Sequence, residues 1–419
     1  MQMVGCKAIA LTAAALHIAL ATALSSGQES SRPTVGNAAA HAVQEIHRRG
    51  KCCIGPRRGG LCWSINADGR PYRILFHGNE FGERGTETSR FDYAHYFEEM
   101  ACGRSYVAAN KHGNMASLDV FQARFPGRVF LVDNVTTIQS IVQDHAIDAV
   151  YTIQAGFAVE PYLQQSGALL LIHGVFSGTE AGPAGAKTAV ISSSVQRASG
   201  VPVVPHMVEP VGLPRRPDLR SELGIGDGAM VFCRHGGKTV FNVPIALEAV
   251  CRDAARRPDH YYVFMNTDTW HCAQSLSNIM FVPMDTSKAG KHRFLSACDA
   301  CIHARQDGET FGLAVAECSN AGLPIITWAG VSLAEDFHLR VLGPLATLYA
   351  TADELTHILD AFNADTAIKR KAAYKAAYAR FAPKTVMLDF LLEFDILGDV
   401  VDAAIGTKKV HSMYSERPA

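Results

Sequence analysis

The chain has 419 residues, more than one hydrophobic core usually organises, so its length favours two domains. Its apolar content of 48% and charged content of 19% are those of a soluble globular protein. A net charge of -1 argues against bulk attraction to nucleic acid or to a membrane surface, so an anionic ligand must be held by local basic groups.

The first residues have the pattern of a targeting segment. Lys7 precedes an apolar run over 8–24, and small residues follow that run. We expect 1–25 to be a signal peptide or a signal-anchor that directs the protein to the secretory pathway, either to the Golgi or ER lumen or to the outside. A membrane span usually needs ~20 apolar residues, so cleavage and membrane anchoring through 8–24 both stay open. The polar residues 26–70 are expected to form a linker or stem.

Strand and helix patterns alternate from residue 72 onward. Continuous apolar strands separated by helical stretches predict a parallel sheet that helices cover on both faces. The helices expected here include 86–100, 136–145 and 159–165. The expected strands of this first set are 73–76, 106–109, 129–132, 149–153, 169–173, 189–192 and 201–204.

A Pro-rich connection near 208–218 interrupts the alternation, which then starts again. The fold class predicted is therefore α/β, with two doubly wound Rossmann-like domains joined by a hinge. We place an N-terminal domain at 71–208, a second domain at 218–365 and C-terminal helices at 366–400. The second set of strands is expected at 230–233, 262–266, 280–283, 300–304, 325–328 and 347–349, and its helices include 244–256, 291–297 and 312–320.

Eleven cysteines are compatible with an oxidising lumen. Those of the linker, Cys52, Cys53 and Cys62, are candidates for a bridge. Cys298-Asp299-Ala300-Cys301 is a Cys-x-x-Cys with no second pair nearby, so we interpret it as two buried structural thiols rather than a zinc site. Asn134-Val135-Thr136 is a glycosylation sequon, which matters if the chain is luminal.

The most informative segment is Gly308-Glu309-Thr310-Phe311-Gly312-Leu313, with Glu317 and Gly322-Leu323-Pro324 after it. Thr310 is a candidate N-cap, and Gly322-Leu323-Pro324 is expected to end the helix and to start a strand. The helix N-terminus suits a phosphate, while Glu317 can accept hydrogen bonds from a ribose diol. One short segment can therefore bind the sugar, the phosphate and the ribose of a nucleotide sugar.

This segment resembles the Glu-x7-Glu element of retaining glycosyltransferases of the GT-B fold, especially family four. The resemblance implies two Rossmann-like domains that face a cleft, with C-terminal helices that cross back onto the first domain. It implies that the second domain binds the nucleotide sugar, UDP- or GDP-linked, and that the first binds the acceptor. In such a site Glu309 orients the donor sugar, Glu317 grips the ribose, and Thr310, Phe311 and Gly312 lie against the donor.

A second motif follows an apolar strand and reads Arg234-His235-Gly236-Gly237-Lys238. Ligands of doubly wound sheets bind at the carboxyl edge, where Arg234 and Lys238 offer positive charge and Gly236 permits close backbone approach. The resembling family has an Arg/Lys pair here that neutralises the donor diphosphate, although the spacing to Lys238 differs and a solvated loop lysine is an equal alternative. No convincing Asp-x-Asp metal motif is present, so we expect metal-independent chemistry without a cofactor.

The remaining candidates lie at strand ends. Arg305 is placed to pair with Glu309 or to contact phosphate, and His303 before it is expected to be a packed strand histidine. In the first domain, Gly85 and Thr86 start a helix after the first strand, and relatives often carry glycines in this loop. His173 ends a strand where relatives often have a histidine near the transferred sugar, although most such histidines are structural.

The function predicted is hexosyltransferase-type transfer from a nucleotide sugar to a glycan, lipid or protein acceptor, with retention of anomeric configuration. A sugar-nucleotide epimerase of the same fold stays open as an alternative. A glycan phosphorylase is less favoured because no pyridoxal lysine motif is found. The rival from a different class is a non-catalytic luminal protein that binds nucleotide sugars or glycans.

Overall fold

The computed structural model describes residues 70–176, 182–196, 201–211, 218–285, 287–332 and 335–396. The expected targeting segment, the linker up to residue 69 with its cysteines, and most of the hinge lie outside these residues. Residues 73–99 and 104–394 form one compact unit, which carries two β-sheets. The domain limits expected from the sequence stay a prediction. In the described part of the chain, no helix is both long enough and apolar enough to cross a membrane.

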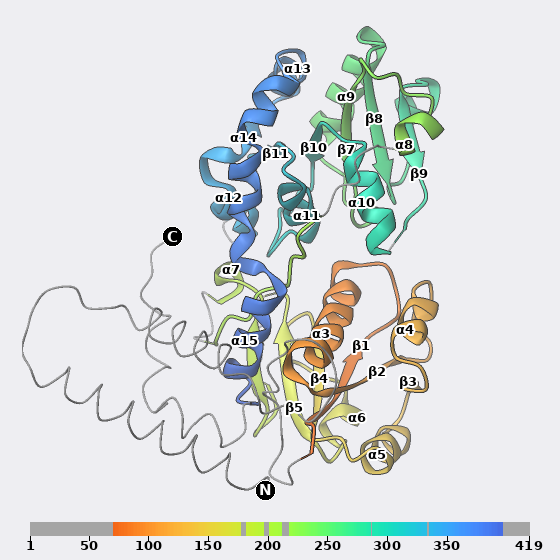
Figure 1. The fold of residues 1–419 in the computed structure, drawn as a ribbon, viewed down its shortest axis with the longest axis vertical. Coiled ribbons are helices and arrows are strands. Elements are labelled where there is room, and N and C mark those ends of the chain that lie inside the picture. The colour runs from red at the N-terminus through yellow and green to blue at the C-terminus, as the bar shows by residue number, and fades with distance from the viewer. Residues whose placement is uncertain are drawn as a thin grey trace, which may run out of the picture. The chain divides into compact units, whose positions relative to one another are not determined.

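The first sheet has six parallel strands in the order β3-β2-β1-β4-β5-β6 (Figure 1). Its strands are β1 (Arg73–Gly78), β2 (Arg104–Asn110), β3 (Val129–Val132), β4 (Ala149–Gln154), β5 (Leu169–Gly174) and β6 (Lys187–Val190). Every residue of β4 is buried, as expected for a parallel strand that has helices on both faces. The chain reverses its direction of strand addition between β1 and β4, so the carboxyl ends of these two strands mark a switch point.

The second sheet repeats this arrangement in the order β12-β11-β10-β7-β8-β9. Its strands are β7 (Met230–Arg234), β8 (His260–Met265), β9 (Ile279–Val282), β10 (Ala300–His303), β11 (Ile325–Trp328) and β12 (Thr347–Tyr349). Its switch point lies between β7 and β10. The two sheets confirm the predicted fold class.

Helices follow most of the strands. Those of the first half are α3 (Gly85–Ala101), α4 (Leu118–Arg124), α5 (Val135–Asp144), α6 (Pro161–Gln164) and α7 (Ser193–Gln196). Those of the second half are α8 (Asp218–Glu222), α9 (Pro244–Arg256), α10 (Lys288–Ser296), α11 (Leu313–Ala321), α12 (Phe337–Leu342) and α13 (Ala352–Asp360), with the short 3-10 turn η1 (His271–Ser275) and a second such turn, η2 (Gly343–Leu345). Helices α9 and α13 supply buried residues to one core of the second sheet, around Phe232, Tyr262 and Tyr349.

The C-terminal helices return to the first sheet, as the sequence resemblance predicted. Helix α14 (Ala364–Ala377) packs on α11, where the Ser319 hydroxyl donates to the carbonyl of Tyr374 over 2.6 Å. After a 3-10 turn, η3 (Ala379–Phe381), helix α15 (Pro383–Glu393) places Phe390 against Phe76 of β1, with 6.4 Å between ring centroids. The same helix brings Phe390 within 5.0 Å of the ring of Tyr93 on α3.

Two sequence interpretations are wrong. The segment 201–204 is not a strand: it forms a single bridge, between Val203 and Val190. The two cysteines of Cys298-Asp299-Ala300-Cys301 are not thiols, because Cys298 is bonded to Cys233 and Cys301 to Cys318. Sequence spacing could not find these partners, because each is brought near by sheet and helix packing.

Candidate functional site

The loop that carries Glu309 follows β10 at the switch point of the second sheet, and its backbone is fixed on both sides. The amide of Glu309 donates to the carbonyl of Glu335 over 2.6 Å, and the amide of Phe337 donates to the carbonyl of Glu309 over 3.2 Å. Gly308 has a φ of 87°, and a Cβ there would lie 2.3 Å from the Glu335 carbonyl oxygen. Only glycine fits this position, so the position of Glu309 is set before any ligand binds.

The Glu309 carboxylate is mostly buried and is held by two basic side chains. Arg305 Nη1 donates to Oε2 over 3.0 Å, and His303 Nε2 lies 3.2 Å from Oε1. Burial by itself would raise the pKa of Glu309, but the hydrogen bond from His303 and the positive charges nearby lower it. Glu309 is therefore a carboxylate at neutral pH. Arg305 therefore forms the ion pair with Glu309 that was one of its two expected roles. His303 is a partner of Glu309 rather than only a packed side chain.

Helix α11 begins later than the sequence suggested. Its N-cap is Gly312, with a φ of 83°, so the prediction of Thr310 as N-cap is wrong. The first hydrogen bond inside the helix runs from the amide of Ala316 to the carbonyl of Gly312, which leaves the amides of 313–315 without a partner within the helix. These amides form the positive end of the helix. Gly322 caps the other end with a φ of 82°, as predicted.

The side chain of Phe311 packs inside the protein. Its side chain is buried in an aromatic cluster and lies 5.1 Å from the ring of His206, 5.1 Å from Phe381 and 5.5 Å from Phe337 between centroids. The contact of Phe311 with the donor stays a prediction, and the burial of the side chain leaves the backbone of this residue to make it. The residue anchors the loop and α11 to the C-terminal helices.

Glu317, on the second turn of α11, is held by two basic side chains that the sequence analysis did not connect with it. Lys291 Nζ of α10 donates to Oε1 over 2.7 Å, and His235 Nε2 lies 2.6 Å from Oε2. Burial by itself would raise the pKa of Glu317, but Lys291 and His235 lower it to about 2. Each carboxylate oxygen uses one of its two lone-pair sites here, so both can still accept a hydrogen bond from a ligand.

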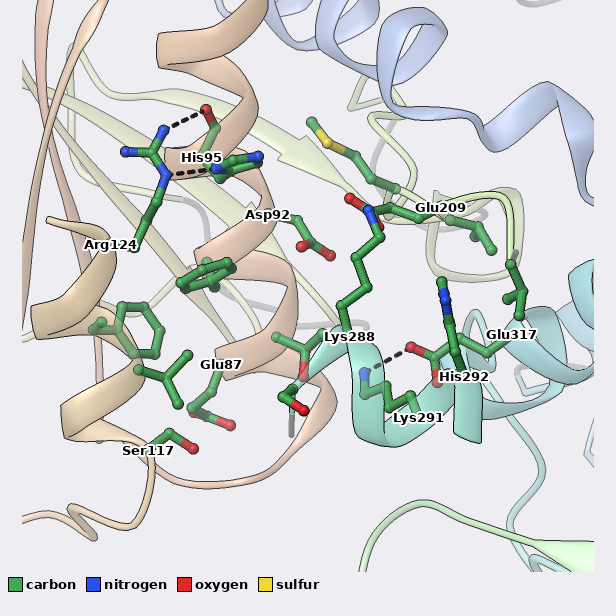
Figure 2. Close-up of a pocket in the computed structure, with 18 of the residues that line it drawn as sticks. Glu87, Asp92, His95, Ser117, Arg124, Glu209, Lys288, Lys291, His292 and Glu317 are labelled. Carbon is green, nitrogen blue, oxygen red and sulfur yellow. Dashed lines mark hydrogen bonds and ion pairs between the residues drawn. The ribbon is translucent and has the colours of Figure 1, made fainter. Parts of the chain in front are cut away.

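Glu317 and Lys291 lie at one end of a cavity of about 360 Å³ (Figure 2). Residues of α3, α4, α10 and α11 line this cavity, together with the segment 207–211. Asp92 on α3 points toward the cavity from the opposite side. Burial raises the pKa of Asp92 to about 8, even though Lys291 opposes the shift. Among the described residues that line this cavity, neither Glu309 nor Arg234 is found.

Arg234 ends β7, beside β10 at the same switch point. Its guanidinium is buried and donates to the Thr267 hydroxyl over 2.6 Å and to the carbonyl of Gly237 over 2.6 Å. Burial lowers its pKa to about 10, and the negative charge of Glu309 opposes this shift. Arg234 therefore stays charged and lies within electrostatic reach of Glu309.

Lys238 is not brought to this site. Its side chain is 69% exposed, and its ammonium lies 3.5 Å from Asp268. The lysine that pairs with Glu317 is Lys291, which comes from α10 rather than from the glycine loop. Gly236 in that loop has a φ of 135°, which favours glycine, and its carbonyl accepts from Asn266 Nδ2 over 3.0 Å.

The candidate site residues of the first half lie in two places, the start of α3 and the core of the first sheet. Gly85 begins α3, and a Cβ there would lie 3.4 Å from Leu313 Cδ1, so this helix start faces the start of α11. Thr86, next to Gly85, donates from its hydroxyl to Glu87 over 2.9 Å. His173 is fully buried: its ring nitrogens lie 2.8 Å from the Tyr151 hydroxyl and 2.7 Å from the carbonyl of Val204. Both ring nitrogens of His173 are thus engaged by groups of the core, and its role in catalysis stays a prediction.

Within the described ranges, no group of three or more His, Cys, Asp or Glu side chains is arranged to hold a metal ion.

No protein-family model matches the chain. No curated protein is significantly similar to it in sequence. Solved structures are similar in fold. A glycosyltransferase from Rickettsia africae ESF-5 matches with a TM-score of 0.60 at 14% identity, over 78% of this chain and 99% of that one. HepE of Anabaena, in complex with UDP-glucose, matches with a TM-score of 0.60 at 15% identity, over 77% of this chain and 99% of that one. WaaG, a glycosyltransferase of lipopolysaccharide biosynthesis, matches with a TM-score of 0.51 at 13% identity, over 78% and 99%.

These matches extend over nearly the whole length of the three proteins. At such low identity they establish the fold. The chain has the GT-B glycosyltransferase fold, with both of its Rossmann-like sheets.

Proposed function

We propose that the chain is a glycosyltransferase that moves a hexosyl group from a UDP- or GDP-linked sugar to a carbohydrate, lipid or protein acceptor. The observation that carries the proposal is the pair Glu309 and Glu317 in a chain of this fold. Glu309 precedes the free amides at the start of α11, and Glu317 follows them in the same helix. HepE, which shares the fold, was solved with UDP-glucose and with UDP. A donor of the same chemical class suits the cations and carboxylates found here.

Glu317 is the residue for the ribose. Its two oxygens are spaced to accept hydrogen bonds from a vicinal diol, and Lys291 and His235 keep it ionised. Glu309 is the residue for hydroxyl groups of the donor sugar, because its carboxylate is ionised and immobilised by Arg305 and His303.

The leaving nucleotide gains about one negative charge when the sugar–phosphate bond breaks, and preorganised positive groups stabilise such a charge most effectively. Arg234 and the amides of 313–315 supply positive charge at this switch point. We therefore propose transfer that is independent of a divalent metal ion. In the retaining course that we propose, the bond from the anomeric carbon to phosphate oxygen breaks, the acceptor oxygen bonds the same face, and its proton passes to the leaving phosphate.

A location in the secretory pathway is part of this proposal. Three disulfides within the described residues support an oxidising environment, since such bonds are rare in the cytosol. The apolar run 8–24 would supply targeting, as a cleaved signal peptide or as a membrane anchor.

The proposal is tested by incubating the full chain with a panel of UDP- and GDP-sugars and measuring free nucleotide, with and without EDTA. We expect release with at least one donor, unaffected by EDTA, and a loss of about 10²-fold or more in rate for Glu309→Ala, as when a preorganised polar contact is removed. The matched control is Glu248→Ala, which removes an exposed carboxylate on α9 that pairs with Arg252. Its rate should equal that of the wild type.

Two outcomes support the alternatives. Tight nucleotide binding with no turnover of any donor would favour a non-catalytic binding protein. Conversion of the donor sugar without net release of nucleotide would favour an epimerase. The anomeric configuration of a transferred sugar, read by NMR, tests retention separately from activity.

A further inference from the structure

Two of the three described disulfides meet in the segment 298–301, which we call the cysteine hub. Cys298 is bonded to Cys233 and Cys301 to Cys318, with Cα–Cα distances of 5.7 and 6.4 Å. All four cysteines are at most 7% exposed. The hub therefore joins two buried cross-links within four residues of chain.

The first cross-link connects elements that carry the cations of the site. Cys233 lies on β7, directly before Arg234 and His235. Cys298 lies two residues beyond the end of α10, the helix that carries Lys291. The disulfide thus fixes the end of α10 against the strand from which Arg234 and His235 emerge.

The second cross-link connects elements that carry the two carboxylates. Cys318 directly follows Glu317 on α11, and Cys301 on β10 is two residues before His303, the partner of Glu309. The sulfur of Cys318 also lies 3.9 Å from His235 Nδ1, on the ring whose Nε2 holds Glu317. This sulfur therefore packs against the histidine that holds Glu317, the carboxylate that we propose for the ribose.

The hub itself is anchored between the cross-links. Asp299 Oδ2 accepts from the amide of Val231 over 2.8 Å and from Arg220 Nη2 over 2.8 Å. The amide of Asp299 donates to the carbonyl of Val231 over 2.8 Å. The cysteine hub is thus fixed to β7 at the centre of the sheet, and it resists displacement of α10 and α11.

We propose that the two disulfides of the cysteine hub are positioning cross-links of the nucleotide site, and that Glu317 and His235 have their binding geometry only in the oxidised chain. The inference rests on the proposed function, because it assigns the cross-links to the same site. Reduction takes two electrons and two protons for each disulfide and yields two thiols. A trialkylphosphine supplies the electrons and becomes the phosphine oxide, with its oxygen from water.

The third disulfide provides a matched control. Cys251 of α9 is bonded to Cys272 of η1, and Trp270 Nε1 lies 3.1 Å from the sulfur of Cys251. The sequence separation is 21 residues, against 17 for Cys301–Cys318. Loops of such similar length give similar chain-entropy stabilisation, so the two double variants should lose similar thermal stability.

The test compares the full oxidised chain with two double variants, using UDP and GDP as probes in calorimetric titrations. Cys301→Ala/Cys318→Ala is the hub variant, and Cys251→Ala/Cys272→Ala is the control variant. We expect the hub variant to bind the preferred nucleotide about 10-fold more weakly or worse, since small displacements of positioned groups have large effects. The control variant should keep the wild-type Kd, and phosphine treatment of the wild type should reproduce the weakened binding. Equal Kd values in both variants would overturn the inference.

Hydrogen exchange gives a reading that needs no ligand. We expect faster amide exchange over 234–238 and 313–317 in the hub variant than in the control variant, both measured at the same margin below their Tm. If the wild type bound neither UDP nor GDP, the proposed function would fail, and exchange alone would decide on the cross-links. Equal exchange in the two variants would overturn the inference even with nucleotide binding intact.

Discussion

On the α11 side of the cavity, the Glu317 carboxylate is already paired with Lys291 and His235. On the α3 side, Asp92 faces the same cavity, and no described side chain makes a hydrogen bond or ion pair with its carboxyl group. The pKa values follow this difference, about 2 for Glu317 and about 8 for Asp92, although burial favours the neutral form of both. Charges that the protein itself holds in place suit a ligand of constant chemistry such as the nucleotide that we propose, whereas on the α3 side the protonation of Asp92 depends on pH.

Two buried arginines, Arg234 in the second half and Arg90 in the first, differ in their surroundings. Arg234, near Glu309, retains its charge at the switch point of the second sheet. Arg90, on α3, is fully buried and donates to the carbonyls of Ala108 and Glu80 over 2.9 and 2.7 Å. It also packs over the ring of Phe81 at 4.8 Å. We propose that the first arginine serves a ligand, whereas the second holds the loop after β1 to its own sheet.

The largest effect is expected from Arg90→Ala. It leaves one buried and one partly buried carbonyl without their donor and opens a cavity beside Phe81, so we expect a loss of about 4 kcal/mol in the free energy of unfolding. Urea denaturation measures this loss. UDP or GDP affinity, measured below the unfolding transition, should be unchanged. A variant that keeps its stability but loses nucleotide binding would contradict the division of roles between the two arginines.

The next largest effect is expected from Glu317→Gln. A neutral amide loses charge-assisted acceptor bonds to the ribose and leaves Lys291 paired less well, so nucleotide affinity should fall about 10²-fold. The Lys291→Met variant should show a smaller fall, because Glu317 keeps His235. Titration with UDP and GDP checks both. Unchanged affinity in Glu317→Gln would remove Glu317 from the nucleotide site.

The pairing of Glu317 also predicts how the free energy of unfolding depends on pH. Its pKa in the folded chain, about 2, is below the usual value of 4.5, so its contribution to stability is complete above pH 4.5 and is lost as the pH falls toward 2. The Glu317→Gln variant lacks this titration, so its unfolding free energy should fall less steeply over that interval. Parallel acid profiles for wild type and variant would contradict the assigned pairing with Lys291 and His235.

The smallest effect is expected from Asp92→Asn. The pKa of Asp92 is raised above its usual value of 3.8, so the folded state binds an extra proton and becomes less stable as the pH rises toward 8. The charged groups around it are Lys291, Lys288, Glu209 and Glu317. The variant should match the wild type at pH 4 and exceed it by roughly 1 kcal/mol at pH 9, in a denaturant titration, because Asp92 is only partly buried and solvent screens most of the cost of its charge. A wild-type advantage at pH 9 would show that Asp92 is stabilised as a carboxylate.

The strands were predictable because parallel strands buried on both faces are continuous apolar runs. The predicted limits of 129–132 and 325–328 agree with β3 and β11, and the helix 244–256 agrees with α9. The segment 201–204 has the same apolar pattern but forms one bridge, because the sheet already ends at β6. Local pattern cannot reveal where a sheet stops.

The turn that carries the two glutamates was predictable because its glycines and its acidic residues lie in one short segment. Gly308, Glu309, Gly312 and Glu317 form such a segment, since the turn into α11 requires two glycines with positive φ. Lys291 and His303 had no comparable signal, because a lysine in a helix and a histidine on a strand are ordinary until a neighbouring element supplies their partner.

The sequence by itself therefore determined the two doubly wound sheets and the positions of both carboxylates, because hydrophobic periodicity and glycine turns act within a few residues of chain. Tertiary structure alone decided which cations hold those carboxylates, that His173 belongs to the core, and that the Cys-x-x-Cys bonds outward to β7 and α11. Each of these facts depends on contact between residues distant in sequence, and such contacts form only when the elements pack.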